Sequence, residues 1–259
     1  MADVGWVWEG QGLDPGVHPS IFGLGEGADF FGLRKVHFLF HPTTALALDK
    51  LRDKDEVVCD ISKWKFRDTD SGGSEHYVDS ALESVCAEAE AVSRWSLEYA
   101  NVTGGFYDDM KGLMEREGHG EAACARVYAA LKSHNPELRL ECVVYAHELA
   151  SAAFWGPLAQ YIDVVSFWVW GYENLATLDA DIDRCRERFP GKPIVMGCYL
   201  RDYPSASPMP MGAIRSQCQT VWQGLEDGRL AGFDILGAVL IDGQIEQAVW
   251  VRDFIRAHS

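Results

Sequence analysis

One pattern constrains the fold more than any other: along the whole chain a short apolar segment is followed by one or two polar residues and then by a segment with helical periodicity. These apolar segments number eight and occupy residues 4–8, 35–40, 56–60, 104–110, 140–145, 164–170, 194–200 and 235–241. Apolar strands joined through helices are typical of a parallel sheet with both faces covered. Eight of them, with a helix closing the chain, predict an α/β fold: one domain, a single (β/α)8 TIM barrel over residues 1–259.

The rival fold is an open doubly wound sheet, whose mark is a glycine-rich phosphate loop directly after an early strand. The glycine-rich candidate, residues 23–27, does not follow a strand directly, so we favour the closed barrel. Between the third and fourth strands we expect a long polar loop, Ser62 to Glu75, that includes Lys63. An amphipathic helix from Tyr77 to Tyr99 should follow, because its apolar residues recur every three or four positions.

The chain is strongly acidic, with 39 acidic against 23 basic residues and a formal net charge of −16. Nucleic acid and anionic membrane surfaces would be repelled, so neither is expected as a partner. No apolar run approaches the ~20 residues that span a bilayer, and the N-terminus lacks a basic region followed by an apolar one. We expect a soluble protein that is cytoplasmic, or secreted or periplasmic if a signal peptide has been removed.

The cysteines indicate neither a metal centre nor a disulfide framework. There are seven, scattered without a C-x-x-C pair, which is typical of small buried hydrophobic residues in a reducing compartment. We therefore predict no bound metal and no cofactor.

In a barrel of this kind the active site lies at the carboxyl ends of the strands, so the candidate residues follow from the strand positions. They form a ring of carboxylates with aromatic residues between them: Glu9, His41, Asp60, Asp108, Asp109, His147, Glu148, Trp168, Trp170, Arg201, Asp202, Tyr203 and Asp242.

The fourth strand ends in two adjacent carboxylates, Asp108 and Asp109. Side chains alternate along a strand, so Phe106 and Asp108 share one side while Tyr107 and Asp109 share the other. One aspartate of the pair continues the inward row, and the sequence leaves open which one. An aspartate at this junction could also cap the following helix, but a cap needs one carboxylate and leaves the second for chemistry.

Nine tryptophans is a high number for this length. Trp8, Trp168, Trp170 and Tyr172 lie at or just beyond strand ends, where an aromatic face could stack against a sugar ring. Plain lining of the barrel is the alternative for each of them.

At this point the chain resembles the glycoside hydrolases that are built on a (β/α)8 barrel. Three features carry the resemblance: residues 105–109 on the fourth strand, the tryptophans of the sixth strand, and residues 199–203 on the seventh. The chain departs from the retaining families with glutamates ending strands four and seven, and it lacks the D-x-x-D-x-D-x-E run of the chitinase-like families. The resemblance therefore implies a class of reaction and names no family.

The predicted function is cleavage of a glycosidic bond by two carboxylates, one kept protonated and one ionised. We predict Asp108 or Asp109 as one catalytic carboxylate and Glu148 as the other, with Asp202 and Asp242 in reserve. The expected partner is a carbohydrate. Residues predicted to bind it are Trp8, Glu9, His41, Asp60, His147, Trp168, Trp170, Tyr172, Arg201, Asp202, Tyr203 and Asp242.

Two other functions stay open. The first is a metal-dependent sugar isomerase, epimerase or lyase with oxygen and nitrogen ligands drawn from the same ring, such as Glu9, Asp60 and His147. Against it, the first strand carries no His-x-His pair. The second is a barrel that binds carbohydrate through its aromatic residues without cleaving it.

Overall fold

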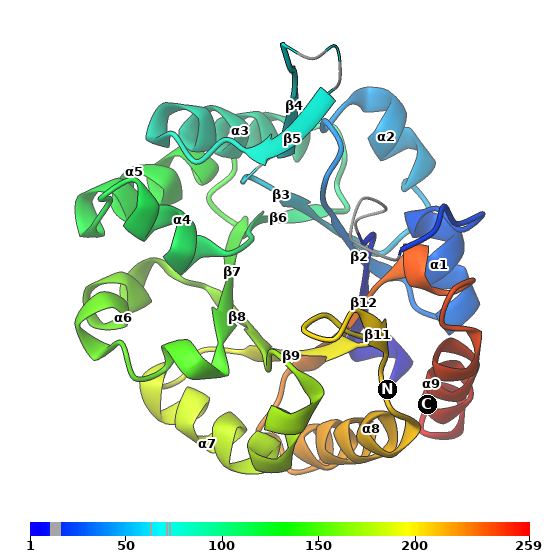
Figure 1. The fold of residues 1–259 in the computed structure, drawn as a ribbon. Coiled ribbons are helices and arrows are strands. Elements are labelled where there is room, and N and C mark those ends of the chain that lie inside the picture. The colour runs from blue at the N-terminus through cyan, green and yellow to red at the C-terminus, as the bar shows by residue number, and fades with distance from the viewer. Residues whose placement is uncertain (11–16, 63, 71, 73) are drawn as a thin grey trace.

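A computed structural model describes residues 1–10, 17–62, 64–70, 72 and 74–259. Within them, eight parallel strands close into a barrel in the order β1-β12-β9-β8-β7-β6-β3-β2, and Figure 1 shows the helices as an outer ring around them. The predicted (β/α)8 barrel is confirmed. The barrel strands are β1 Gly5–Trp8, β2 Lys35–Phe38, β3 Glu56–Asp60, β6 Val102–Tyr107, β7 Arg139–Tyr145, β8 Val164–Trp168, β9 Ile194–Tyr199 and β12 Gly232–Leu236.

Helices connect the strands on the outside of the barrel (Figure 1). The α-helices are α1 Leu24–Phe31, α2 Ala45–Lys50, α3 Leu82–Trp95, α4 Met110–Arg116, α5 Glu121–Leu131, α6 Ala152–Leu158, α7 Leu178–Arg188, α8 Met211–Glu226 and α9 Ile245–Ala257. Short 3-10 turns lie at η1 Ala2–Val4, η2 Ala146–Glu148, η3 Ala159–Tyr161, η4 Tyr172–Thr177 and η5 Ala238–Leu240. In the described part of the chain, none of these helices has the length and apolar character that a bilayer crossing requires.

The last barrel strand lies earlier in the sequence than predicted. β12 ends at Leu236, where its pairing with Trp8 of β1 and Tyr199 of β9 ends, and the apolar residues that follow form the η5 turn. The prediction of a strand over 235–241 was wrong because an apolar run alone does not distinguish a strand from a buried turn. Asp242 therefore does not end a strand. It lies beyond η5, exposed, and accepts hydrogen bonds from Ser20 Oγ at 2.6 Å and Ile21 N at 2.9 Å.

The prediction of a loop from Ser62 to Glu75, after the third strand, was also wrong in part. Trp64–Asp68 (β4) and Ser74–Val78 (β5) form an antiparallel hairpin that projects from one side of the barrel in Figure 1. The helix α3 accordingly begins at Leu82 and not at Tyr77. Aromatic and basic residues alternate through the first hairpin strand with period two, which is a strand pattern. Lys63 lies outside the described residues.

The barrel interior is closely packed around a glycine on β9. A Cβ added at Gly197 would lie 2.1 Å from Cδ2 of Trp168, so the indole ring occupies the space a side chain would need. Trp168 is 1% exposed. The glycine thus allows a tryptophan to lie across the inner wall of the barrel.

We expect Gly197→Ala to lower the free energy of unfolding by about 1–3 kcal/mol, because an overpacked core must displace the indole ring. Denaturant unfolding followed by tryptophan fluorescence measures the change. Gly212→Ala in α8 is the matched control, since an added Cβ there meets nothing within 4 Å. Equal stability of Gly197→Ala and wild type would contradict the packing described for Trp168.

Candidate active site

A cluster of ionisable side chains, which the strand-end reasoning missed, lies inside the barrel. His37 of β2 is fully buried, with its Nε2 3.2 Å from Oε2 of Glu141 and its Nδ1 2.7 Å from Oδ2 of Asp234. Trp8 Nε1 donates a hydrogen bond to the same Asp234 oxygen. The sequence carried a signal for this cluster. His37 in β2, Glu141 in β7 and Asp234 in β12 are each an ionisable residue within a mostly apolar strand.

The charges of this cluster compensate one another. Burial by itself lowers the pKa of His37, but the negative charge of Asp234 and the hydrogen bonds to Asp234 and Glu141 outweigh it and raise the pKa to about 9. Burial raises the pKa of Asp234, and His37 opposes that shift. An imidazolium held between two carboxylates is the arrangement that makes buried charges tolerable.

The alternation of side chains along β6 identifies Asp108 as the inward aspartate. Phe106 packs in the barrel interior, with its ring centroid 4.9 Å from that of Trp8 and 4.5 Å from that of His37. Asp108 is two residues further on, just past the end of β6, and alternation continued by one residue would place it in the same inward row.

Asp109 reaches the same region by a different route. Its backbone is in the left-handed region, with φ 46°, and it precedes the first turn of α4. Its Oδ1 accepts a hydrogen bond from the hydroxyl of Tyr145, at 2.8 Å, across the β6–β7 pair. A left-handed non-glycine residue costs backbone energy, and such residues are concentrated at functional sites. Its side chain makes no capping hydrogen bond to α4.

The two aspartates are held in different electrostatic states. Burial raises the pKa of Asp108 well above its usual range, and the negative charges of Asp109 and Asp60 raise it further. Desolvation also raises the pKa of Asp109, although its surface is exposed, and the hydrogen bond from Tyr145 reduces that rise without cancelling it. Asp108 is therefore the carboxyl group that keeps its proton to higher pH.

Asp60 ends β3 and is fully buried. Its Oδ1 accepts hydrogen bonds from the backbone N of Ser62 at 2.7 Å and from Ser62 Oγ at 2.8 Å. Ser62 Oγ also lies 3.4 Å from the carbonyl oxygen of Asp108. Asp60 thus joins the end of β3 to the end of β6 and contributes negative charge beside Asp108.

Glu148 lies in the η2 turn that follows β7. Its Oε2 accepts a hydrogen bond from the backbone N of Tyr145 at 3.1 Å, and burial raises its pKa. Tyr145 therefore contacts Glu148 through its backbone and Asp109 through its hydroxyl. The catalytic role predicted for Glu148 stays a prediction, and the contact shows that it also fixes the turn.

Aromatic side chains surround the two aspartates on the β7, β8 and β9 side. Trp170 lies edge-on to Tyr145, with ring centroids 6.1 Å apart, and stacks on Tyr203 at 5.5 Å. Tyr199 ends β9 and lies 5.4 Å from Tyr203. Trp8 and Trp168 pack against each other at 4.7 Å and are nearly fully buried, so for these two the barrel-lining alternative accounts for their position.

The loop after β9 is organised by Asp202. Its Oδ1 accepts a hydrogen bond from the backbone N of Tyr172 at 3.0 Å, and its Oδ2 accepts from Ser205. Arg201 and Asp202 form β10, which pairs with β11 Ser207–Pro208 as a short hairpin. Both side chains are buried, and the guanidinium of Arg201 lies 5.8 Å from the ring centroid of Tyr203.

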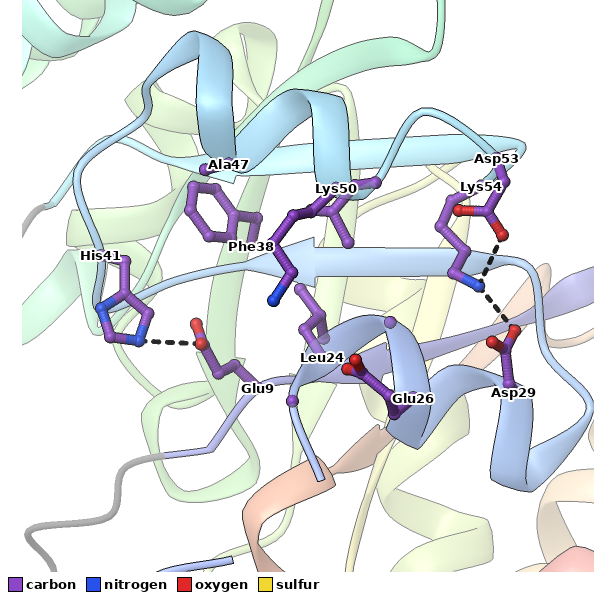
Figure 2. Close-up of a pocket in the computed structure, with 13 residues that line it drawn as sticks. Glu9, Leu24, Glu26, Asp29, Phe38, His41, Ala47, Lys50, Asp53 and Lys54 are labelled. Atoms are coloured by element: carbon purple, nitrogen blue, oxygen red, sulfur yellow. Dashed lines mark hydrogen bonds and ion pairs between the residues drawn. The ribbon is translucent and has the colours of Figure 1, made fainter. Parts of the chain in front are cut away.

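Glu9 and His41 line a separate cavity of about 420 Å³ between α1 and α2. Figure 2 shows them at one end of it, joined by an ion pair of 2.9 Å between Oε1 and Nε2, with Lys54 at the other end. His147 is exposed and stacks on Tyr145, with ring centroids 5.5 Å apart. In the described residues, no group of three or more His, Cys, Asp or Glu side chains has an arrangement suited to a metal ion.

Many solved structures have the same architecture. A scan of family models and a search of curated proteins found no match. A family GH18 chitinase from the fern Peteris ryukyuensis superimposes with a TM-score of 0.56 at 13% identity, covering 98% of this chain and 99% of that one. The chain shares its (β/α)8 barrel fold with this chitinase. A β-glucuronidase from Bacteroides uniformis matches with a TM-score of 0.55 at 11% identity, over 83% of this chain and 28% of the other.

A third similar structure has a different stated role. It is a xylanase-α-amylase inhibitor protein, XAIP-I, in complex with trehalose, with a TM-score of 0.56 at 13% identity over 99% of each chain. The resemblance expected from the sequence is thus confirmed for the barrel. At these identities the likeness concerns the fold, and the chemistry has to be argued from the residues of this chain.

Proposed function

We propose that the chain is a glycosidase in which Asp108 is the general acid. The observation that carries this proposal is the pair Asp108–Asp109 at the end of β6, where desolvation raises the pKa of Asp108 well above its usual range and raises that of Asp109 less far, because Tyr145 donates a hydrogen bond to it. Two carboxyl groups whose pKa values are pushed apart can serve as acid and base at one pH. Similar barrels that are glycoside hydrolases support the class of reaction.

In the proposed reaction Asp108 donates its proton to the glycosidic oxygen as the bond from that oxygen to the anomeric carbon breaks. An ionised carboxylate stabilises the positive charge that develops on the sugar, and Asp109 and Glu148 are the two candidates for it. A water then adds its hydroxyl group to the anomeric carbon and gives up the remaining proton to a carboxylate. The exposed face of Trp170 and the ring of Tyr203 would stack against the sugar.

The substrate class is tested by a screen of aryl glycosides and oligosaccharides with product analysis. We expect at least one member to be cleaved by the wild type and left intact by the double variant Asp108→Asn/Asp109→Asn. If the wild type binds a member of the panel but releases no reducing sugar, the protein is a barrel that binds carbohydrate without cleaving it, and the glycosidase proposal is wrong. That alternative is favoured by one observation, the similarity to the inhibitor protein whose structure contains trehalose.

Tyr145→Phe should shift the pH dependence of turnover. The phenol hydrogen bond lowers the pKa of Asp109, so its loss lets that pKa rise. If Asp109 must be ionised, activity is lost as pH falls through its pKa, and the acidic limb of the kcat/KM profile should move to higher pH in the variant. The basic limb, which reports Asp108, should move less.

Tyr128→Phe is the control for this shift, because its hydroxyl bonds Asp163 at 3.1 Å outside the barrel mouth. An unchanged acidic limb in Tyr145→Phe would favour Glu148 over Asp109 as the ionised group.

A further inference from the structure

A polar groove lies directly beside the aromatic residues that surround Asp109. Its volume is about 540 Å³, within the range of small-molecule sites. The η2 turn and the two residues after it form one wall, and η4 with α7 forms the other. Val169 and Trp170, which follow β8, lie between the two walls.

The groove is linked to Asp109 through three contacts made by Tyr145, a residue that lies beside the groove and does not line it. Tyr145 donates its hydroxyl hydrogen to Asp109 at 2.8 Å. Its ring stacks on His147, with an interplanar angle of 19°, and lies edge-on to Trp170. His147 and Trp170 both line the groove, and each contacts the ring of Tyr145, whose hydroxyl donates to Asp109.

The exposed surface of Trp170 is unusual in this protein. The residue is 41% exposed. Among the large hydrophobic residues that are exposed in the described part of the chain, Trp170 is aromatic and the others are aliphatic. The groove beside it is lined by hydrogen-bonding groups, including Thr177, Arg184 and Arg188. An aromatic face next to hydroxyl and guanidinium groups matches a sugar, whose rings have an apolar face and a polar edge.

Hydrogen bonds hold the walls of the groove in place. Asn174 Nδ2 donates to the carbonyl of Trp170 at 2.7 Å, and Arg188 Nε donates to the carbonyl of Leu149 at 3.1 Å, which joins α7 to the opposite wall. Thr177 Oγ1 donates to Asp181 at 2.8 Å. A groove fixed in this way would bind a ligand without first ordering its own side chains.

We propose that this groove holds additional sugar residues of an oligosaccharide whose cleaved bond lies at Asp108 and Asp109. The inference rests on the proposed glycosidase and narrows its substrate to a chain of sugars, in place of a single sugar with a small leaving group. The chain passes from the carboxylates across Tyr145 and Trp170 into the groove, where Arg184, Arg188 and Thr177 bind its hydroxyl groups.

The test fills the groove without touching the carboxylates. Ala150 is exposed and lines the groove, so Ala150→Trp places an indole inside it. Ala153→Trp is the matched control, because Ala153 is exposed on the neighbouring α6 and does not line the groove. Binding of cello-, chito-, xylo- and maltopentaose, and of the matching disaccharides, is measured by titration calorimetry on the full chain in an Asp108→Asn background.

We expect one pentasaccharide to bind at least tenfold more tightly than its disaccharide, and Ala150→Trp to remove most of that gain while Ala153→Trp retains it. This result supports binding of sugar residues in the groove even if no sugar is hydrolysed. In that case only the proposed glycosidase activity is contradicted. Equal pentasaccharide affinity in Ala150→Trp and Ala153→Trp overturns the groove, whatever the activity. If the Asp108→Asn protein without a further substitution prefers no pentasaccharide over its disaccharide, the proposal is overturned as well.

Discussion

Asp108→Asn should reduce kcat by about 10²- to 10⁴-fold on whichever glycoside the wild type cleaves, because the amide cannot donate the proton that the leaving oxygen requires. The same substitution should leave the folded state as stable as the wild type, or more stable. Burial and the charges of Asp109 and Asp60 oppose ionisation of Asp108, so above the unfolded pKa this carboxyl must take up a proton on folding, and a neutral amide removes that cost.

The expected signature is therefore a loss of turnover without a loss of stability. Asp55→Asn is the control, since Asp55 is an exposed carboxylate that precedes β3 at the opposite end of the barrel. Wild-type turnover in Asp108→Asn would exclude it as the acid. A parallel loss of activity and of folding would assign Asp108 a structural role.

The sequence was sufficient for the architecture because a parallel barrel needs long-range pairing of strands that are apolar on both faces. Such strands are visible as mostly apolar runs, and each of the eight predicted runs overlaps a barrel strand. The predictions that failed concerned the residues at which strands begin and end. A run such as 235–241 contains both the end of β12 and the η5 turn, and pairing with Trp8 and Tyr199 determines where the strand stops.

For the site, the order of the strands predicted that it lies at their carboxyl ends. It could not predict which side chains contact one another there. The alternation along β6 left Asp108 and Asp109 equivalent until Phe106 was found inside the barrel. The hydrogen bond from Tyr145 joins residues 36 positions apart and has no local signal. Asp242 was assigned to the ring from a misplaced strand end, and its contacts with Ser20 and Ile21 place it in a loop.

The interior cluster under the carboxylates is the most sensitive part of the fold. His37→Leu removes the cation between Asp234 and Glu141, and of the two carboxylates Glu141 keeps a cationic partner, Arg139, whose Nη2 lies 3.5 Å from its Oε1. Breaking a buried ion pair by removing one partner costs about 3–5 kcal/mol, and we expect a loss of unfolding free energy of this size in denaturant titrations. Replacing all three residues by neutral ones, His37→Leu with Glu141→Gln and Asp234→Asn, should restore part of the loss, because no uncompensated charge remains.

The cluster also gives the stability a defined pH dependence. The pKa of His37 rises from 6.5 in the unfolded chain to about 9 in the folded one. Its protonation therefore stabilises the fold fully below the unfolded pKa, and this contribution is lost as pH rises through the folded value. Denaturant titrations at pH 6 and above pH 9 should show a larger decrease in the wild type than in His37→Leu. Equal decreases in the two proteins would mean that His37 is already neutral in the barrel, and burial with the charges of Asp109 and Asp60 would then raise the pKa of Asp108 without opposition from His37.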